Sequence, residues 1–198
     1  MDIETYQTLR TETGNYRARI VRDQDAVNPR EDFEHAVHVI TIDTHCGKYI
    51  NVDEDGGPLE WAWERIKGEM PDHLAVETFK RYARIFHGAT VFESFPHYGA
   101  ASLWYITAED MEREGFGDPA AYIEAEHDEY RAWAEGECFG FHIEERVVYK
   151  RAEPTGDAAK DWRWEWESID SLWGIYGYDW AKSMAQDALD SLAAEEVA

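Results

Sequence analysis

The excess of acidic over basic side chains is the feature that most limits how this chain can fold. The 198 residues include 42 Asp and Glu against 19 Lys and Arg, a formal net charge of −23. Mutual repulsion of these charges opposes compaction, so a folded state needs a large apolar interior. The 9 Trp, 11 Tyr and 8 Phe can supply it, whereas disordered acidic chains lack aromatic residues. The sequence therefore predicts an aromatic core beneath an acidic surface.

The length of the chain indicates one domain over residues 1–198, with two sub-lobes, 1–99 and 100–198, as the alternative. Residues 187–198 are acidic, and we expect them to fray at the end of a helix. Cys46 and Cys138 do not make a disulfide framework. The N-terminal residues are polar, and no apolar run approaches the roughly 18 residues that span a bilayer. These features predict a cytoplasmic protein.

Alternating and β-branched stretches predict strands, and capping residues predict helices between them. We expect strands over residues 16–21, 36–44, 89–95, 101–107 and 138–149. The expected helices are 59–67, 72–86, 118–135 and 180–192, with a short acidic helix after Thr107. Asp110 would complete a capping box with Thr107, and Asp118-Pro119 would start the longer helix. This pattern predicts an α+β fold, a mainly antiparallel sheet with helices packed on one side.

Three tryptophans alternate with charged residues near the C-terminus, at positions 162, 164 and 166. A period of two predicts a strand with one aromatic face. Because aromatic side chains dominate the energetics of protein cores, we expect Trp162, Trp164, Trp166 and Trp173 to be buried.

Several short motifs follow one another in a characteristic order. NPRED at 28–32 follows Asp23 and Asp25, GECFGFHI occupies 136–143, and DSLWGIYG occupies 170–177. This order resembles a family of small acidic proteins encoded by phages and mobile elements, which carry an NPRE-type motif and a late DSxWGxYG element. The family's Trp-Asp-x-Gly-Gln turn reads His97 to Ala100 here, and its late cysteine is Leu172. The resemblance implies a phage or mobile-element origin and no particular chemistry.

Carboxylates concentrated on two expected helices suggest a surface that imitates nucleic acid. Residues 107–137 include 11 acidic and 2 basic side chains. Such a surface would repel nucleic acid and anionic membranes, and a basic cleft would attract it. We hypothesise that the protein is not an enzyme and inhibits a host restriction or CRISPR protein by occupying its nucleic-acid channel. The residues expected to contact this partner are Glu109, Asp110, Glu112, Glu114, Glu124, Asp128, Glu129 and Glu135.

Two alternatives remain open at this point. His45, His87 and His97 could serve a small enzyme or metal protein around the turn at Gly99. The spacing of His35, His38, Cys46, Cys138 and His142 matches zinc sites only loosely, and the sequence has no phosphate-binding loop or nucleophile elbow. We therefore assign no catalytic residue, metal or cofactor. In the second alternative, the acidity is an adaptation of a whole proteome to high salt.

Overall fold

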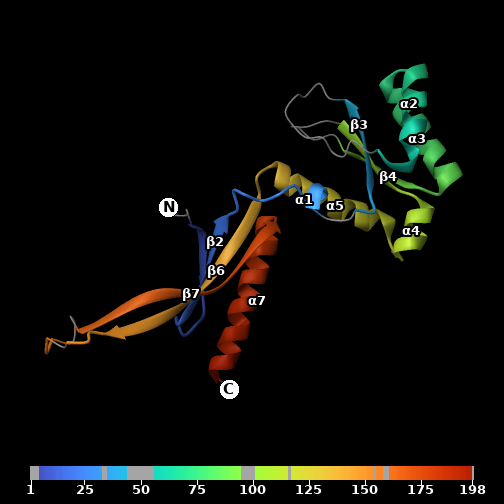
Figure 1. Ribbon diagram of the computed structural model, residues 1–198. Coiled ribbons are helices and arrows are strands. Elements are labelled where there is room, and N and C mark those ends of the chain that lie inside the picture. The colour runs from blue at the N-terminus through green and yellow to red at the C-terminus, as the bar shows by residue number, and fades with distance from the viewer. Residues whose placement is uncertain are drawn as a thin grey trace. The chain divides into compact units, whose positions relative to one another are not determined.

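The computed structural model describes residues 5–32, 35–43, 56–94, 101–115, 117–153, 155–157 and 161–197. The chain forms two compact units, which differ in their boundaries from sub-lobes that meet at residue 99. Unit 1 comprises Met1–Val27 and Glu135–Ala198, and unit 2 is Asn28–Ala134, inserted between these two segments. Each unit combines helices with antiparallel strands, so the expected α+β class is confirmed (Figure 1).

Unit 1 is built on a four-stranded antiparallel sheet with the strand order β1-β2-β6-β7. Its strands are β1 (Thr5–Arg10), β2 (Tyr16–Arg22), β6 (Cys138–Lys150) and β7 (Trp162–Tyr176). Strand β1 was not expected, because its residues are largely exposed and polar. Helix α7 (Tyr178–Val197) covers one face of the sheet. The core between them includes Ala18, Ile20, Phe139, Phe141, Ile143, Ala181, Ala185 and Leu189.

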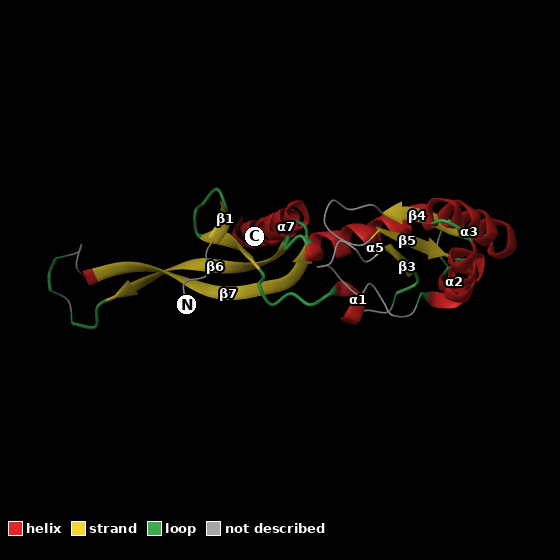
Figure 2. Ribbon diagram, turned by 90° about the horizontal axis from the view of Figure 1, so that it is seen from above, coloured by secondary structure: helices red, strands yellow, loops and turns green. Residues whose placement is uncertain are grey.

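Strands β6 and β7 continue past the end of β2 as a two-stranded ribbon (Figure 2). The β2–β6 pairing ends at Tyr16 and Glu145, whereas the β6–β7 pairing continues to Lys150 and Trp162. The ribbon therefore consists of residues 146–150 and 162–166. The expectation that its tryptophans are core residues is wrong, since no further described element covers this end of the sheet. Trp162 is 48% exposed and Trp164 57% exposed.

Unit 2 contains a three-stranded antiparallel sheet with the order β3-β5-β4. The strands are β3 (His38–Asp43), β4 (Thr90–Ser94) and β5 (Ala101–Ile106). The helical segments are α1 (Pro29–Asp32), η1 (Gly57–Leu59), α2 (Glu60–Glu69), α3 (Asp72–His87), α4 (Ala108–Glu114) and α5 (Pro119–Ala134).

Helices cover both faces of the unit 2 sheet, whereas the sequence led us to expect one covered face. Successive residues of a strand point to opposite faces. On β5, Leu103 and Tyr105 join the core formed with α2 and α3. The intervening Trp104 and Ile106 join the core formed with α5. The alternation explains why β5 reads as a continuous apolar run, which is typical of a strand buried on both sides.

Two of the predicted helix starts are confirmed in atomic detail. Thr107 Oγ1 accepts a hydrogen bond from the Asp110 backbone N–H, and Asp110 Oδ2 accepts one from the Thr107 N–H, which completes the capping box of α4. Asp118 Oδ1 accepts a hydrogen bond from the Ala120 N–H at the start of α5. Helix α3 begins at Asp72, where the helix over 72–86 was predicted to start, but Pro71 is its N-cap and no side chain caps that end.

Candidate functional site

The predicted acidic surface lies mostly on α4 and α5 of unit 2. The side chains that the structure exposes there are Glu109, Glu112, Glu114, Glu124, Asp128 and Glu129. Glu135 is also exposed, but it belongs to unit 1. Glu129 is partly desolvated, and this burial raises the pKa of its carboxyl.

Asp110 was expected on this surface, and that assignment is wrong. The residue is only 4% exposed, because its carboxylate turns back to cap α4. Asp110 Oδ2 also lies 3.2 Å from His38 Nε2. Burial opposes ionisation, but the hydrogen bonds from Thr107 and the charges of His38 and Arg113 outweigh it and lower the pKa of Asp110. The capping box could have excluded Asp110 from the sequence alone, since a capping carboxylate faces the backbone.

Two arginines of the same helices neutralise part of the acidic surface. Arg113 lies 2.8 Å from Glu114, and Arg131 lies 3.1 Å from Asp128. Among the described residues, no ion pair involves Glu109, Glu112, Glu124 or Glu129, which we call the unpaired carboxylates. The surface that can attract a cationic partner is therefore smaller than the predicted one.

The NPRED motif anchors the start of unit 2. Asn28 Oδ1 accepts a hydrogen bond from the Arg30 N–H, and Pro29 occupies the first position of α1. The buried Arg30 guanidinium donates to Glu126 on α5 and to the Val37 carbonyl oxygen. It also lies 5.2 Å from the centre of the Trp104 ring. These contacts give the motif a structural role.

Asp23 connects the other two motifs of the resemblance within unit 1. Its carboxylate accepts a hydrogen bond from the Gly174 N–H, and its own N–H donates to the Cys138 carbonyl oxygen. Gly174 has a φ of +73° and lies where two residues of β7 face Gly140 of β6, a β-bulge. The late DSLWGIYG element is therefore a bulged strand that Asp23 fixes in place.

The histidines considered for catalysis do not form a described site. His87 Nε2 lies 3.2 Å from the Tyr82 hydroxyl, and its ring packs against Tyr82. His45, Cys46 and His97 lie outside the described residues. Within the described ranges, no three His, Cys, Asp or Glu side chains are arranged to hold a metal ion. Nor does any helix there have the length and apolar character that a membrane span requires.

The second candidate surface, which the sequence reading missed, is the face of the unit 1 sheet opposite α7. Trp166 and Trp164 on β7 lie opposite Arg146 and Val148 on β6. Directly paired residues share a face of a sheet, so tryptophans and cations occupy the same side. We call this side the open face. The alternation of Trp162, Trp164 and Trp166 did predict a shared face, but not that this face is exposed.

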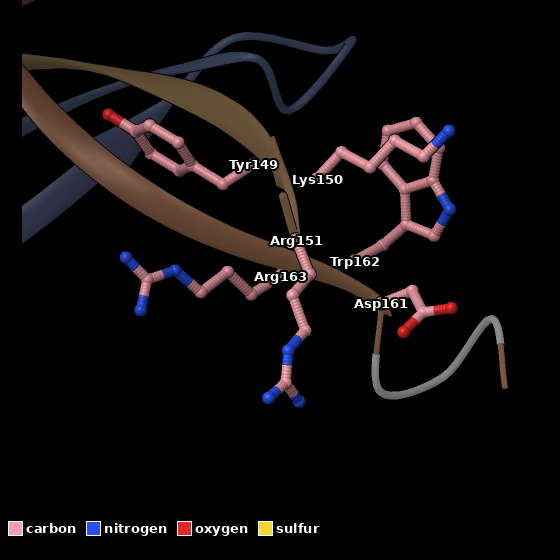
Figure 3. A pocket seen from close by; sticks show the side chains of 6 residues that line it. All are labelled: Tyr149, Lys150, Arg151, Asp161, Trp162 and Arg163. Carbon is pink, nitrogen blue, oxygen red and sulfur yellow. The ribbon is translucent and has the colours of Figure 1, made fainter. Parts of the chain in front are cut away.

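The end of the ribbon is hollowed. The hollow has a volume of about 400 Å³ and is lined by Tyr149, Lys150, Arg151, Asp161, Trp162 and Arg163 (Figure 3). Asp161 is committed to the turn, because its carboxylate accepts hydrogen bonds from the Thr155 N–H and hydroxyl and from the Gly156 N–H. The backbone hydrogen bond from Thr155 contributes most to the lowered pKa of Asp161. Three cationic side chains therefore surround this hollow.

Comparison of the chain with protein-family models, with curated proteins and with solved structures finds no match.

Proposed function

We propose that this protein is a non-enzymatic binding protein of phage or mobile-element origin that occupies the basic nucleic-acid channel of a host defence protein. The target class is a restriction or CRISPR protein, and the contact is made by α4 and α5. The observation that carries the proposal is the set of unpaired carboxylates on these two successive helices. The order of the NPRED and DSLWGIYG motifs supports the phage origin.

The physical basis of the proposal is competition for a cationic channel. Duplex DNA presents one negative charge for about every 1.7 Å of its axis, and proteins that bind it line their channels with Lys and Arg. Exposed carboxylates that lack intramolecular partners offer such a channel an alternative anion. Charge steering would make their capture fast, and added salt would weaken it.

Charge reversal tests the proposed surface. The test variant combines Glu109→Lys, Glu112→Lys, Glu124→Lys and Glu129→Lys. The matched control combines Glu60→Lys, Glu64→Lys, Glu69→Lys and Asp72→Lys, four exposed acids on α2 and α3 of the same unit. Both variants change the net charge equally, so only the position of the charges differs. Circular dichroism verifies that both variants fold.

The measurement is inhibition of DNA cleavage by purified restriction and CRISPR nucleases of the host. We expect the wild type and the control to inhibit one of them at stoichiometric concentration, with weaker inhibition at higher salt. The test variant should not inhibit. Equal inhibition by both variants would show that the position of these carboxylates does not matter, which would reject α4 and α5 as the contact surface. No inhibition by the wild type would reject the function itself.

A further inference from the structure

The open face of unit 1 separates cations from carboxylates. Arg10 pairs with Arg17 across β1 and β2, and Arg17 pairs with Glu144 on β6. Residues two apart on a strand share a face, which adds Arg146 and Lys150 to this side. Glu144 is the one carboxylate among the described residues at these positions, and it is buried between Arg17 and Arg19, with which it forms ion pairs.

The opposite side of the ribbon and of the adjoining sheet carries the acids, together with Arg163, which forms an ion pair with Glu165. Glu145 faces Glu167 across the β6–β7 pair, and Val147 faces Glu165. In a chain with a net charge of −23, the general acidity does not explain why the open face holds cations while the exposed carboxylates of these strands lie on the opposite side. This segregation indicates a surface that meets an anion.

Three cations of the open face, Arg17, Arg146 and Lys150, each lie against a tryptophan. The Arg17 guanidinium is 4.2 Å from the centre of the Trp166 ring, and that of Arg146 is 3.6 Å from the Trp164 ring. Lys150 extends over the Trp162 ring, with its Nζ 5.4 Å from the ring centre (Figure 3). Cation–π contact holds these long side chains in a row. Arg17 already donates to Glu144, whereas Arg146 and Lys150 form no ion pair among the described residues and can donate outward.

We propose that the open face, together with the ribbon, binds a single-stranded nucleic acid. Alternate strand residues are about 6.7 Å apart, so the three tryptophans offer a row of stacking platforms on one side. Bases stack on aromatic rings without regard to sequence, and Arg and Lys between the rings contact the phosphates. In a duplex, the bases already stack on one another and cannot use these rings. At the ribbon end, Lys150 of this row also lines the hollow.

This proposal goes beyond the proposed function and rests on other residues in another unit. It also opposes the expectation from net charge that the chain repels nucleic acid, because the net charge sums over the whole chain and does not describe a single face of unit 1. Insertion of the ribbon and the adjoining part of β7 into an anionic membrane is the less favoured interpretation, since it would bury Glu165 and Glu167 in lipid at a high free-energy cost. A strand that lies on the open face leaves both carboxylates in water.

Fluorescence anisotropy of a labelled 20-nucleotide oligothymidine tests the proposal. The test variant is Trp164→Ala with Arg146→Gln. The matched control is Trp180→Ala with Lys182→Gln, which removes an exposed tryptophan and an exposed lysine from α7 of the same unit. Loss of one stacked base and one phosphate contact should weaken binding by at least about fivefold in the test variant. The control should bind as the wild type does.

A second variant keeps the proposal testable if the first variant does not fold. Lys150→Glu with Arg151→Glu changes two exposed side chains at the ribbon end and should also weaken binding. Absence of binding by the wild type would overturn the proposal, as would equal loss in the control. Tighter binding to a duplex of the same length would exclude stacking. Binding to anionic phosphatidylserine vesicles but not to the oligonucleotide would assign the face to a membrane surface instead.

Discussion

Arg30 Nη1 lies 3.0 Å from Glu126 Oε2, which joins α1 to α5 across 96 positions of the chain. Both side chains are well buried. Burial raises the pKa of Glu126 to about 7, although the charge of Arg30 and hydrogen bonds from the Ala36 and Val37 backbone oppose the shift. The stability of unit 2 therefore depends on pH through the ionisation of Glu126.

We predict that Glu126→Gln removes this pH dependence. A carboxyl that keeps its proton up to about pH 7 in the folded state, but loses it near its ordinary 4.5 when unfolded, favours the folded state below pH 4.5. That contribution is lost as the pH rises to about 7, by ~1.4 kcal/mol for each unit of difference between the two pKa values. Urea denaturation of the wild type and the variant at pH 4.5 and 7.5 measures it. A difference between the two proteins that stays constant with pH would contradict the prediction.

Gly140→Ala should destabilise unit 1 by about 1–3 kcal/mol. A Cβ at this position would overlap the Trp173 ring and lie 2.8 Å from the Leu172 carbonyl oxygen, and the backbone oxygen has little freedom to move. Gly68→Ala on α2 is the control, since no atom lies within 4 Å of its added Cβ. That substitution should be neutral or stabilising, because Ala favours helix. Thermal denaturation measures the stability of the two variants, and equal melting temperatures would contradict the predicted clash.

Asp23→Ala should cost about 1 kcal/mol of stability, since the Gly174 N–H at the bulge loses its acceptor. Asp25→Ala is the matched control, because this exposed carboxylate accepts no hydrogen bond from any described residue. Amide hydrogen exchange at Gly174 gives a local measurement. Exchange there should accelerate in the Asp23 variant alone, and unchanged exchange would show that the bulge holds without this contact.

Asp110→Ala should lower the stability of unit 2 by about 1 kcal/mol through loss of the α4 cap. Glu112→Ala on the same helix removes an exposed carboxylate and should have little effect. Because the pKa of Asp110 is lowered, its contribution is present above the ordinary carboxyl pKa and is lost as the pH falls through the folded value. Denaturation at pH 7 and pH 3 checks both statements. A Glu112 variant as unstable as the Asp110 variant would contradict them.

Local signals in the sequence were sufficient to place several elements. Thr107 with Asp110, and Asp118 with Pro119, act within one turn of helix, so their partners lie only a few residues away. The tertiary structure changes such contacts little. The predicted helix over 118–135 accordingly agrees with α5 (Pro119–Ala134).

The sequence alone could not predict which distant strands lie beside one another. The period of two at Trp162, Trp164 and Trp166 shows that these residues share a face, but burial depends on which strands lie beside them. Because the β2–β6 pairing ends at Tyr16 and Glu145, no third strand or helix among the described residues covers the ribbon. The basic partners Arg17 and Arg146 come from two other strands, and only the register brings them to Trp166 and Trp164.

The insertion of unit 2 between β2 and β6 sets an order of assembly. Arg22 and Phe139 are neighbours in one sheet, yet all of unit 2 separates them along the chain. During synthesis, β1 and β2 leave the ribosome long before β6 exists, whereas the inserted segment already holds every strand of its own sheet. Its early folding shortens the loop that the outer sheet must later close, which reduces the entropy cost. Mutations that slow the folding of unit 2 should therefore also delay the formation of the unit 1 sheet.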